Sequence, residues 1–327
     1  MSRSRSLLAL VALVVLLLLS APATAQDKRY AARVELHPIQ TLTLSDEQFL
    51  SGDTAGGKPV TVSGQLRIAQ GSGRLPVVVL VHGSGGMGAN IELWTSELGD
   101  LGISTFAIDG FTGRGLTQVS TDQSQLGRLN LIVDAYRALG ILAKHPRVDA
   151  SRIALMGFSR GGQAALFASL RRFHRAWNTS GAEFAAYVPF YPDCMTTYLA
   201  DTDVADRPIR IHHGTPDDYN PVAPCQRYVE RLRVAGRDVQ LTEYPNAQHA
   251  FDVPLLPATL VAKSSQTVRR CVIREESGER LVNAATGNVF SYADACVERD
   301  PHLGYDPVAT RAAIQSVREL LKTVFKL

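Results

Sequence analysis

Short, continuously apolar runs alternate with amphipathic helical patterns along most of the chain. The runs lack the in–out alternation of a half-exposed strand, which is typical of strands buried on both faces of a parallel sheet. They cover residues 76–81, 103–108, 152–158, 184–190, 209–212 and 239–244. Helical patterns separate or follow them at residues 91–98, 126–142, 163–173, 224–235 and 307–325. This order predicts an α/β fold, a doubly wound, mostly parallel sheet with helices on both faces.

Two stretches depart from this alternation. Before the first parallel run, residues 34–44 and 60–68 are typical of an antiparallel pair of strands joined through a glycine-rich turn. Near the end of the chain, residues 254–304 contain two β-like runs, 268–274 and 280–282, which predict a hairpin within an insertion. We expect this insertion near the ligand-binding face, because ligands of such sheets bind beyond the carboxyl ends of the strands.

The first 25 residues have the composition of a secretory signal peptide. Arg3 and Arg5 precede thirteen consecutive apolar residues, 7–19, and Ala23-Thr24-Ala25 supplies a small-residue cleavage pattern. Thirteen helical residues rise only about 20 Å, short of a hydrocarbon core of about 30 Å, so cleavage is favoured over an uncleaved anchor. We therefore expect residues 1–25 to be removed and an exported chain, 26–327, to fold as a single domain without stable membrane insertion.

Composition and charge narrow the function classes. Lys and Arg number 34 against 31 Asp and Glu, a formal net charge of +3, and no run of Lys or Arg is longer than a pair. That balance argues against nucleic acid as a partner. With 45% hydrophobic and 20% charged residues, the chain has the apolar content of a folded protein, which excludes an intrinsically disordered one.

All four cysteines, Cys194, Cys225, Cys271 and Cys296, lie in the predicted mature chain, where an oxidising compartment permits disulfides. Of the three possible pairings, we favour Cys194–Cys225 with Cys271–Cys296, because it closes the two shortest loops that do not overlap. Four buried free thiols are the alternative. No two cysteines have the spacing of a zinc-binding motif, so no metal site is expected.

The motif Gly157-Phe158-Ser159-Arg160-Gly161 lies between an apolar strand and a predicted helix. In this strand–turn–helix context it is typical of a nucleophile elbow. The turn is so sharp that a Cβ two residues before or after the serine would collide with neighbouring backbone, and the serine takes a strained conformation with its hydroxyl exposed. Ser159 is therefore the candidate nucleophile. A serine that merely caps the helix is the alternative.

A serine hydroxyl needs a base to remove its proton and an acid to orient that base. In the chain order serine, acid, histidine, His249 is the candidate base because it follows the last predicted core strand, and His302 is the alternative. Asp217 and its neighbour Asp218, in the loop after the preceding strand, are the candidate acids.

Three further residues near these positions are of the same types as the candidate acid and base. Asp193, in the loop after an earlier strand, is an outside candidate for the acid. His212 and His213 precede the acid, and we expect them to cap the end of a strand.

The glycine-rich segment His82-Gly83-Ser84-Gly85-Gly86 ends the strand predicted to lie beside the nucleophile strand. Glycines there let the backbone approach a substrate, and the amide N–H groups of Ser84 and Arg160 would point at a developing oxyanion. The segment matches neither a phosphate-binding loop nor a dinucleotide-binding turn, because both need a different glycine spacing. No metal or organic cofactor is expected.

These motifs together resemble the α/β-hydrolases of the dienelactone hydrolase family, over roughly residues 60–253 and the terminal helix. The register of a Gly-x-x-Asp-x-x-x-Pro run favours Asp217 over Asp218 as the acid. The family's founding members carry a cysteine nucleophile for a small charged lactone, whereas this chain has Ser159, and together with export this favours a general carboxylesterase. The matching segments are residues 82–86, 109–115, 157–161, 214–221 and 247–251.

The residues and the resemblance together predict an exported serine hydrolase that cleaves a small-molecule carboxylic ester through an acyl-enzyme. A serine peptidase or a polysaccharide-ester deacylase on the same fold is the alternative, and a non-catalytic hydrolase-like binding protein is the least favoured. Arg114 and Arg160 are candidates for holding an acidic substrate group, or else solvated surface charges. Candidates for the pocket wall, with core packing favoured for each, are Trp94, Phe111, Tyr191 and Tyr219.

Overall fold

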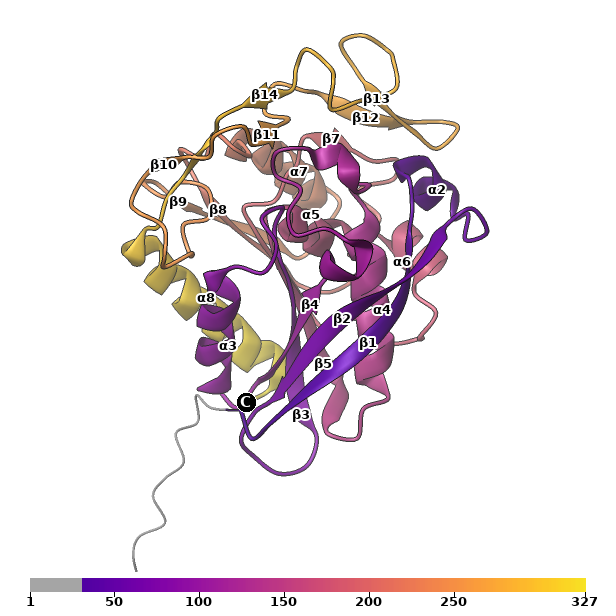
Figure 1. The fold of residues 1–327 in the computed structure, drawn as a ribbon. Helices are drawn as coiled ribbons and strands as arrows, with labels where there is room; N and C mark the ends of the chain where they lie inside the picture. Colours follow the sequence, from indigo (N-terminus) through magenta and orange to yellow (C-terminus); the bar gives the residue numbers. More distant parts are fainter. Residues whose placement is uncertain (1–30) are drawn as a thin grey trace, which may run out of the picture.

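The computed structural model describes residues 31–327, so the predicted signal peptide lies outside the described residues. Its centre is an eight-stranded sheet with the order β1-β2-β4-β3-β5-β6-β8-β9 (Figure 1). The strands are β1 (Arg33–Thr43), β2 (Lys58–Ile68), β3 (Leu75–Val81), β4 (Ser104–Asp109), β5 (Val148–Phe158), β6 (Tyr187–Phe190), β8 (Ile209–Gly214) and β9 (Val239–Tyr244). β2 pairs antiparallel with β1 and β4, and all other pairs are parallel. The predicted sheet and its antiparallel lead-in pair are confirmed.

Helices cover both faces of this sheet, as the alternation of patterns predicts. One face packs against α3 (Ala89–Gly99) and α8 (Pro307–Phe325). The other packs against α4 (Asn130–Ala143), α5 (Arg160–Phe167), α6 (Arg171–Trp177) and α7 (Val222–Val234). A short helix, α2 (Asp46–Ser51), and two 3₁₀ turns, η1 (Thr112–Arg114) and η2 (Gln123–Gln125), lie in the connections.

The central strand β3 shows why the apolar runs are continuous. Val77 and Val79 face the α4 side of the sheet, while Val78 and Leu80 face the α3 side, and all four are fully buried. Each such side chain contributes about 1.5–3 kcal/mol through its burial. A polar residue at any of these positions would lose that contribution. Polar and apolar residues therefore do not alternate along β3 as they do along a strand with one exposed face.

Besides shifts of a few residues at the ends of elements, two local features differ from the sequence prediction. The helical pattern at 163–173 is two helices, α5 and α6, and α5 begins at Arg160, directly after the elbow. Helix α2 was not predicted, although Ser45 and Gln48 form a capping box at its start. That signal is present in the sequence as Ser-x-x-Gln, but the helix is too short to show an apolar periodicity.

The predicted insertion, residues 254–304, carries a hairpin as predicted, although its first strand lies at 273–276 and not at 268–274, and it crosses one end of the sheet (Figure 1). The hairpin is formed by β12 (Ile273–Glu276) and β13 (Arg280–Asn283), and β12 also pairs with the two-residue strand β7 (Thr196–Thr197). Two further short ladders, β10–β15 and β11–β14, close the insertion on itself. Their strands are β10 (Leu260–Val261), β11 (Gln266–Thr267), β14 (Glu298–Arg299) and β15 (His302–Leu303).

Disulfides join Cys194 to Cys225 and Cys271 to Cys296, which is the pairing favoured from loop length. The Cys271–Cys296 bond lies within the insertion and links the start of its hairpin to the residues just before β14. Over residues 31–327 the structure has no helix that is both long and apolar enough to cross a membrane.

We expect the free energy of unfolding of the double variant Cys271→Ala, Cys296→Ala to be roughly 3–4 kcal/mol lower than that of the wild type. The bond closes a loop with a sequence separation of 25 residues, and in the chain-entropy model a crosslink of that length restricts the unfolded state by about this amount. Urea denaturation followed by circular dichroism measures the difference. If the double variant and the oxidised wild type unfold at the same urea concentration, the bond contributes nothing.

Candidate active site

The turn between β5 and α5 has the strained geometry of a nucleophile elbow. Ser159 has φ 54° and ψ −114°, a left-handed conformation that a residue with a side chain seldom adopts. A Cβ on Gly157 would lie 2.0 Å from the carbonyl oxygen of Gly161, and one on Gly161 would lie 2.1 Å from that of Val81. Only glycine fits at either position, so the backbone argument made from the motif is confirmed.

Three side chains from three loops meet at this turn. His249 Nε2 lies 2.9 Å from Ser159 Oγ, and His249 Nδ1 lies 2.7 Å from Asp217 Oδ2. Ser159 follows β5, Asp217 follows β8 and His249 follows β9. They converge because the carboxyl ends of parallel strands meet at one edge of the sheet. With Nδ1 protonated and donating to Asp217, Nε2 is left to accept the hydroxyl proton of Ser159.

The carboxylate of Asp217 is buried and held in its ionised form. Its Oδ1 accepts the backbone N–H groups of Tyr219 and Asn220 at 2.8 and 2.9 Å. Burial raises the pKa of Asp217, but the attraction of His249 and hydrogen bonds from His213 and His249 outweigh it and hold the pKa at about 2. The ionised group therefore stabilises the fold above about pH 4, and this stabilisation is lost as the pH falls through about 2.

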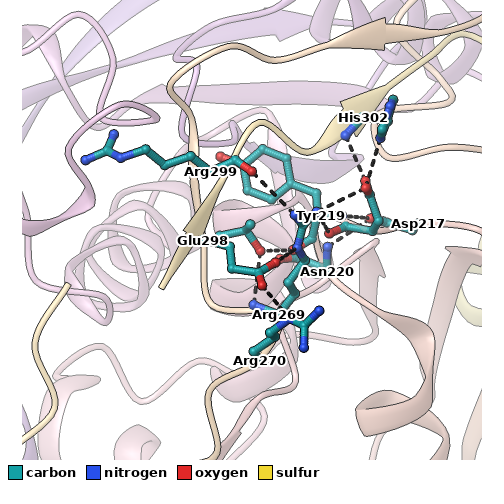
Figure 2. Close-up of polar contacts among 10 residues, drawn as sticks. Asp217, Tyr219, Asn220, Arg269, Arg270, Glu298, Arg299 and His302 are labelled. Carbon is teal, nitrogen blue, oxygen red and sulfur yellow. Dashed lines mark hydrogen bonds and ion pairs between the residues drawn. The ribbon is translucent and has the colours of Figure 1, made fainter. Parts of the chain in front are cut away.

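Asp218 points away from the elbow and binds the insertion instead. Its carboxylate accepts from Arg269 Nη1 at 3.0 Å and from the backbone N–H of His302 at 2.7 Å, and it lies 2.9 Å from His302 Nδ1. Figure 2 shows the loop of Asp217 lying against these insertion residues. Asp218 and His302, the two alternatives for the acid and the base, are thus paired with each other and not with Ser159.

The other residues weighed for the acid and base lie outside this cluster. Asp193 forms a buried ion pair with Arg128. His212 stacks on Phe190, and its Nδ1 lies 2.8 Å from the hydroxyl of Tyr244; burial lowers its pKa to about 3.

His213 lies beside the acid, in contrast to its neighbour. Its Nε2 donates to the carbonyl of Asn220 at 2.7 Å and is 3.5 Å from Asp217 Oδ2. It therefore supports the loop that carries the acid.

The glycine-rich segment after β3 lies directly against the nucleophile. A Cβ on Gly83 would be 3.2 Å from the Cβ of Ser159. Ser84, Ser159 and Arg160 all line a small polar cavity of about 20 Å³. Arg160 is the first residue of α5, where backbone N–H groups have no partner within the helix and favour negative charge. The segment and the helix start therefore both lie beside Ser159.

Gln123, a residue that the sequence analysis did not single out, joins the parts of this site. Its Oε1 accepts from Ser84 Oγ and from Arg160 Nη2, both at 3.0 Å. Its Nε2 donates to the backbone oxygen of Gln266 in the insertion at 3.0 Å, and its backbone N–H donates to Gln266 Oε1 at 2.8 Å. No motif marks Gln123, because its role comes from contacts across 143 positions of sequence.

Ser159 also lines a larger cavity of about 350 Å³. Tyr219 stacks on the imidazole of His249 with ring centroids 4.6 Å apart, and Tyr191 meets the same ring edge-on at 4.7 Å. The sequence favours core packing for both tyrosines, with pocket lining as the alternative, and in the structure both line this cavity. Its apolar wall consists of Phe158, Tyr191, Tyr219, Val253, Leu256 and Leu303. Leu256 and Leu303 belong to the insertion, which therefore lies at the ligand-binding face, as expected, and forms part of the pocket wall.

The prediction that Arg114 holds an acidic substrate group is wrong, and so is its alternative as a surface charge. The guanidinium is buried and binds both carboxylate oxygens of Asp134, at 2.7 and 2.9 Å, as well as the carbonyls of Leu42 and Gly110. The guanidinium N–H groups of Arg114 thus bind groups of α4 and β1 and link η1 to both elements. The side chain of Arg160 is also buried, donating to the carbonyl oxygens of Leu126 and Gln123, so the same prediction fails for it.

Trp94 and Phe111 belong to the core, the account favoured for them from the sequence. Trp94 is fully buried, and its indole N–H donates to Asp252 at 2.7 Å. The other oxygen of Asp252 accepts from the hydroxyl of Tyr191 at 2.5 Å. Trp94 thus supports the pocket wall from behind without lining it. Phe111 packs edge-on against His82, below the glycine-rich segment.

The sheet order, the elbow and the order of the three loops define an α/β-hydrolase fold. The sequence model of the dienelactone hydrolase family matches residues 62–274, and the chain belongs to this family, whose members are hydrolases acting on esters. No match was found among curated proteins.

Two solved structures illustrate the likeness of fold. A putative dienelactone hydrolase from Klebsiella pneumoniae subsp. pneumoniae has a TM-score of 0.53 at 15% identity, covering 88% of this chain and 98% of that one. A dienelactone hydrolase-like promiscuous phosphotriesterase from metagenomic libraries has a TM-score of 0.54 at 18% identity, again covering 88% and 98%. At these identities the likeness bears on the fold alone.

Proposed function

We propose that the chain is an exported serine esterase that cleaves small carboxylic esters through an acyl-enzyme. The observation that carries this proposal is the continuous hydrogen-bonded series from Ser159 Oγ through His249 to Asp217. Export is supported by the two disulfides, which form and persist in oxidising compartments, and by the signal-like composition of residues 1–25.

In the first half-reaction, Ser159 Oγ attacks the ester carbonyl as His249 Nε2 takes the hydroxyl proton. The buried carboxylate of Asp217 stabilises the imidazolium that forms and keeps Nδ1 protonated. Negative charge develops on the carbonyl oxygen, where the backbone N–H groups of Ser84 and Arg160 would stabilise it. His249 then gives its proton to the alcohol oxygen as the ester bond breaks. The alcohol leaves, and the acyl group stays on Ser159.

In the second half-reaction, water attacks the acyl-enzyme with His249 again as the base. The tetrahedral intermediate collapses, the proton returns to Ser159 Oγ, and the carboxylic acid leaves. The cycle consumes one water and one ester and needs no further reactant. The cavity of about 350 Å³ has room for one apolar substituent of the ester beside Ser159.

Covalent labelling tests the proposal directly. A fluorophosphonate probe should label the mature chain once, and mass spectrometry should place the adduct on the peptide that contains Ser159. A panel of p-nitrophenyl esters, acetylated oligosaccharides and peptide amides then separates the proposed esterase from the peptidase and the polysaccharide-ester deacylase. A correctly folded chain that is not labelled and cleaves none of the panel would instead be a binding protein.

We expect Gln123→Ala to lower kcat for an ester substrate roughly 10- to 100-fold with little change in KM. The substitution removes the shared contact of Ser84 and Arg160, so the donors to the oxyanion lose their mutual alignment, an interaction that matters most in the transition state. Gln125→Ala is the matched control, since Gln125 ends the same 3₁₀ turn but bonds only locally to Asp122. Equal kcat values for the two variants would contradict a positioning role for Gln123.

A further inference from the structure

Three potential metal ligands converge at the edge of the sheet, where no part of the proposed mechanism operates. Glu35 and His37 lie two residues apart on β1, so their side chains share one face of the strand. His145 lies just after α4, the helix that packs along β1 (Figure 1). β1 is an edge strand, separated in the strand order from β5, β8 and β9, whose ends carry the catalytic residues.

The ligand atoms of these residues all lie within 4.8 Å of one another. Glu35 Oε2 is 3.0 Å from His37 Nε2 and 3.1 Å from His145 Nε2, and the two imidazole rings meet edge-on with centroids 5.8 Å apart. The side chains of Glu35, His37 and His145 are 14%, 22% and 11% exposed. The cluster is therefore shielded from bulk water but still reachable by a small ion.

The surroundings of Glu35 favour its ionised carboxylate. Burial raises the pKa of Glu35, but hydrogen bonds from His37 and His145 and the attraction of His145 and Arg33 outweigh it, and the pKa is lowered. Arg33 Nε lies 2.8 Å from Oε1, the oxygen that the imidazoles do not use. Arg33 is 70% exposed, so this contact is an ion pair screened by solvent.

We propose that Glu35, His37 and His145 form a binding site for a divalent first-row transition ion, with Zn²⁺ as the test ion. Two imidazole nitrogens and one carboxylate oxygen are ligands that such ions prefer, and a water would complete a tetrahedron. Zinc–ligand bonds of about 2.0–2.1 Å set neighbouring ligands about 3.3–3.4 Å apart. The observed separations of 3.0 and 3.1 Å from Glu35 need to widen by a few tenths of an ångström, and the two imidazole nitrogens, which lie within 4.8 Å of each other, need to reach the same spacing.

Binding an ion would break hydrogen bonds that the three side chains form without it. Without the ion, the Nε2–H group of each imidazole donates to Glu35, and an ion bound at Nε2 requires that proton to move to Nδ1. For His145 this ends the bond that Nδ1 accepts from the backbone N–H of Arg147, at 3.2 Å. The ion replaces these bonds with three coordinate bonds. It would also fasten β1 to the connection between α4 and β5, and by mass action it would stabilise the fold.

Zinc titration of the mature chain by isothermal calorimetry, together with thermal unfolding followed by circular dichroism, tests the site. The wild type should bind one Zn²⁺ saturably and unfold at a higher temperature with it. His37→Ala and His145→Ala should each weaken binding by at least about ten-fold, since even residues behind the ligands contribute 10- to 100-fold. Neither variant should gain unfolding temperature from zinc.

Two control variants separate this site from other histidines. His249→Ala, which removes the proposed catalytic imidazole, and His174→Ala, which removes a partly buried imidazole bonded to Asn178, should both bind zinc as the wild type does. If His37→Ala or His145→Ala fails to fold, X-ray absorption on the zinc-loaded wild type should show two imidazole ligands. The proposal is overturned if the wild type shows no saturable binding, if binding survives in both histidine variants, or if the spectrum lacks imidazole.

Discussion

Ser159→Ala should lower kcat for a p-nitrophenyl ester by roughly 10⁴- to 10⁶-fold, leaving only the residual rate supplied by the oxyanion donors and binding. The variant lacks Ser159 Oγ, which lies 2.9 Å from His249 Nε2 and is the oxygen that makes the proposed attack. KM should change little, because the cavity beside Ser159 keeps all its other lining groups. Steady-state kinetics measure the loss, and the fluorophosphonate adduct should disappear with it.

The matched control for this variant is Ser120→Ala. Ser120 also lines the cavity, but its hydroxyl donates to Gln118, which is not part of the catalytic cluster. We expect its kcat to stay within about three-fold of the wild type, as for a substitution that leaves the transition state untouched. If Ser159→Ala retains wild-type turnover, Ser159 is not the nucleophile. Another group must then carry the acyl transfer.

The three predicted residues that the structure brings together are marked by local sequence signals. The elbow is specified by residues within five positions of each other, since Gly157 and Gly161 are required by the backbone approach that Ser159 imposes. The loops of Asp217 and His249 follow directly from strands whose apolar runs are legible in the sequence. The positions of these residues depend on the chain nearby, so residue types and spacing were sufficient to predict them.

The failures concern roles that depend on distant contacts. Arg114 looks like a free charge in its glycine-rich loop, and only the fold shows that it meets Asp134, twenty positions away. Gln123 carries no motif, because it joins Ser84 to Gln266 across the site. The ladders β10–β15 and β11–β14 have two residues per strand, too few for any periodicity. The sequence pattern therefore does not determine which polar residues are buried or which partners they bind.

Asp217→Asn should lower kcat roughly 10⁴-fold, by forcing the wrong tautomer on His249. In the wild type, Oδ1 of Asp217 accepts two backbone N–H groups, from Tyr219 and Asn220, while Oδ2 faces His249 Nδ1. The amide oxygen of asparagine must take the Oδ1 position to keep those two bonds. Its NH₂ group then faces Nδ1, which must accept, so the imidazole proton moves to Nε2 and the base can no longer take the proton of Ser159.

Asp218→Asn is the matched comparison, one position along the same loop. The carboxylate of Asp218 is partly exposed and contacts Arg269 and His302, so its loss removes one screened ion pair and should change kcat by no more than about three-fold. Kinetics of the two variants, with circular dichroism to verify folding, decide the assignment. A large loss in Asp218→Asn with near-normal turnover in Asp217→Asn would transfer the role of the acid to Asp218 and require the loop to rearrange when substrate binds.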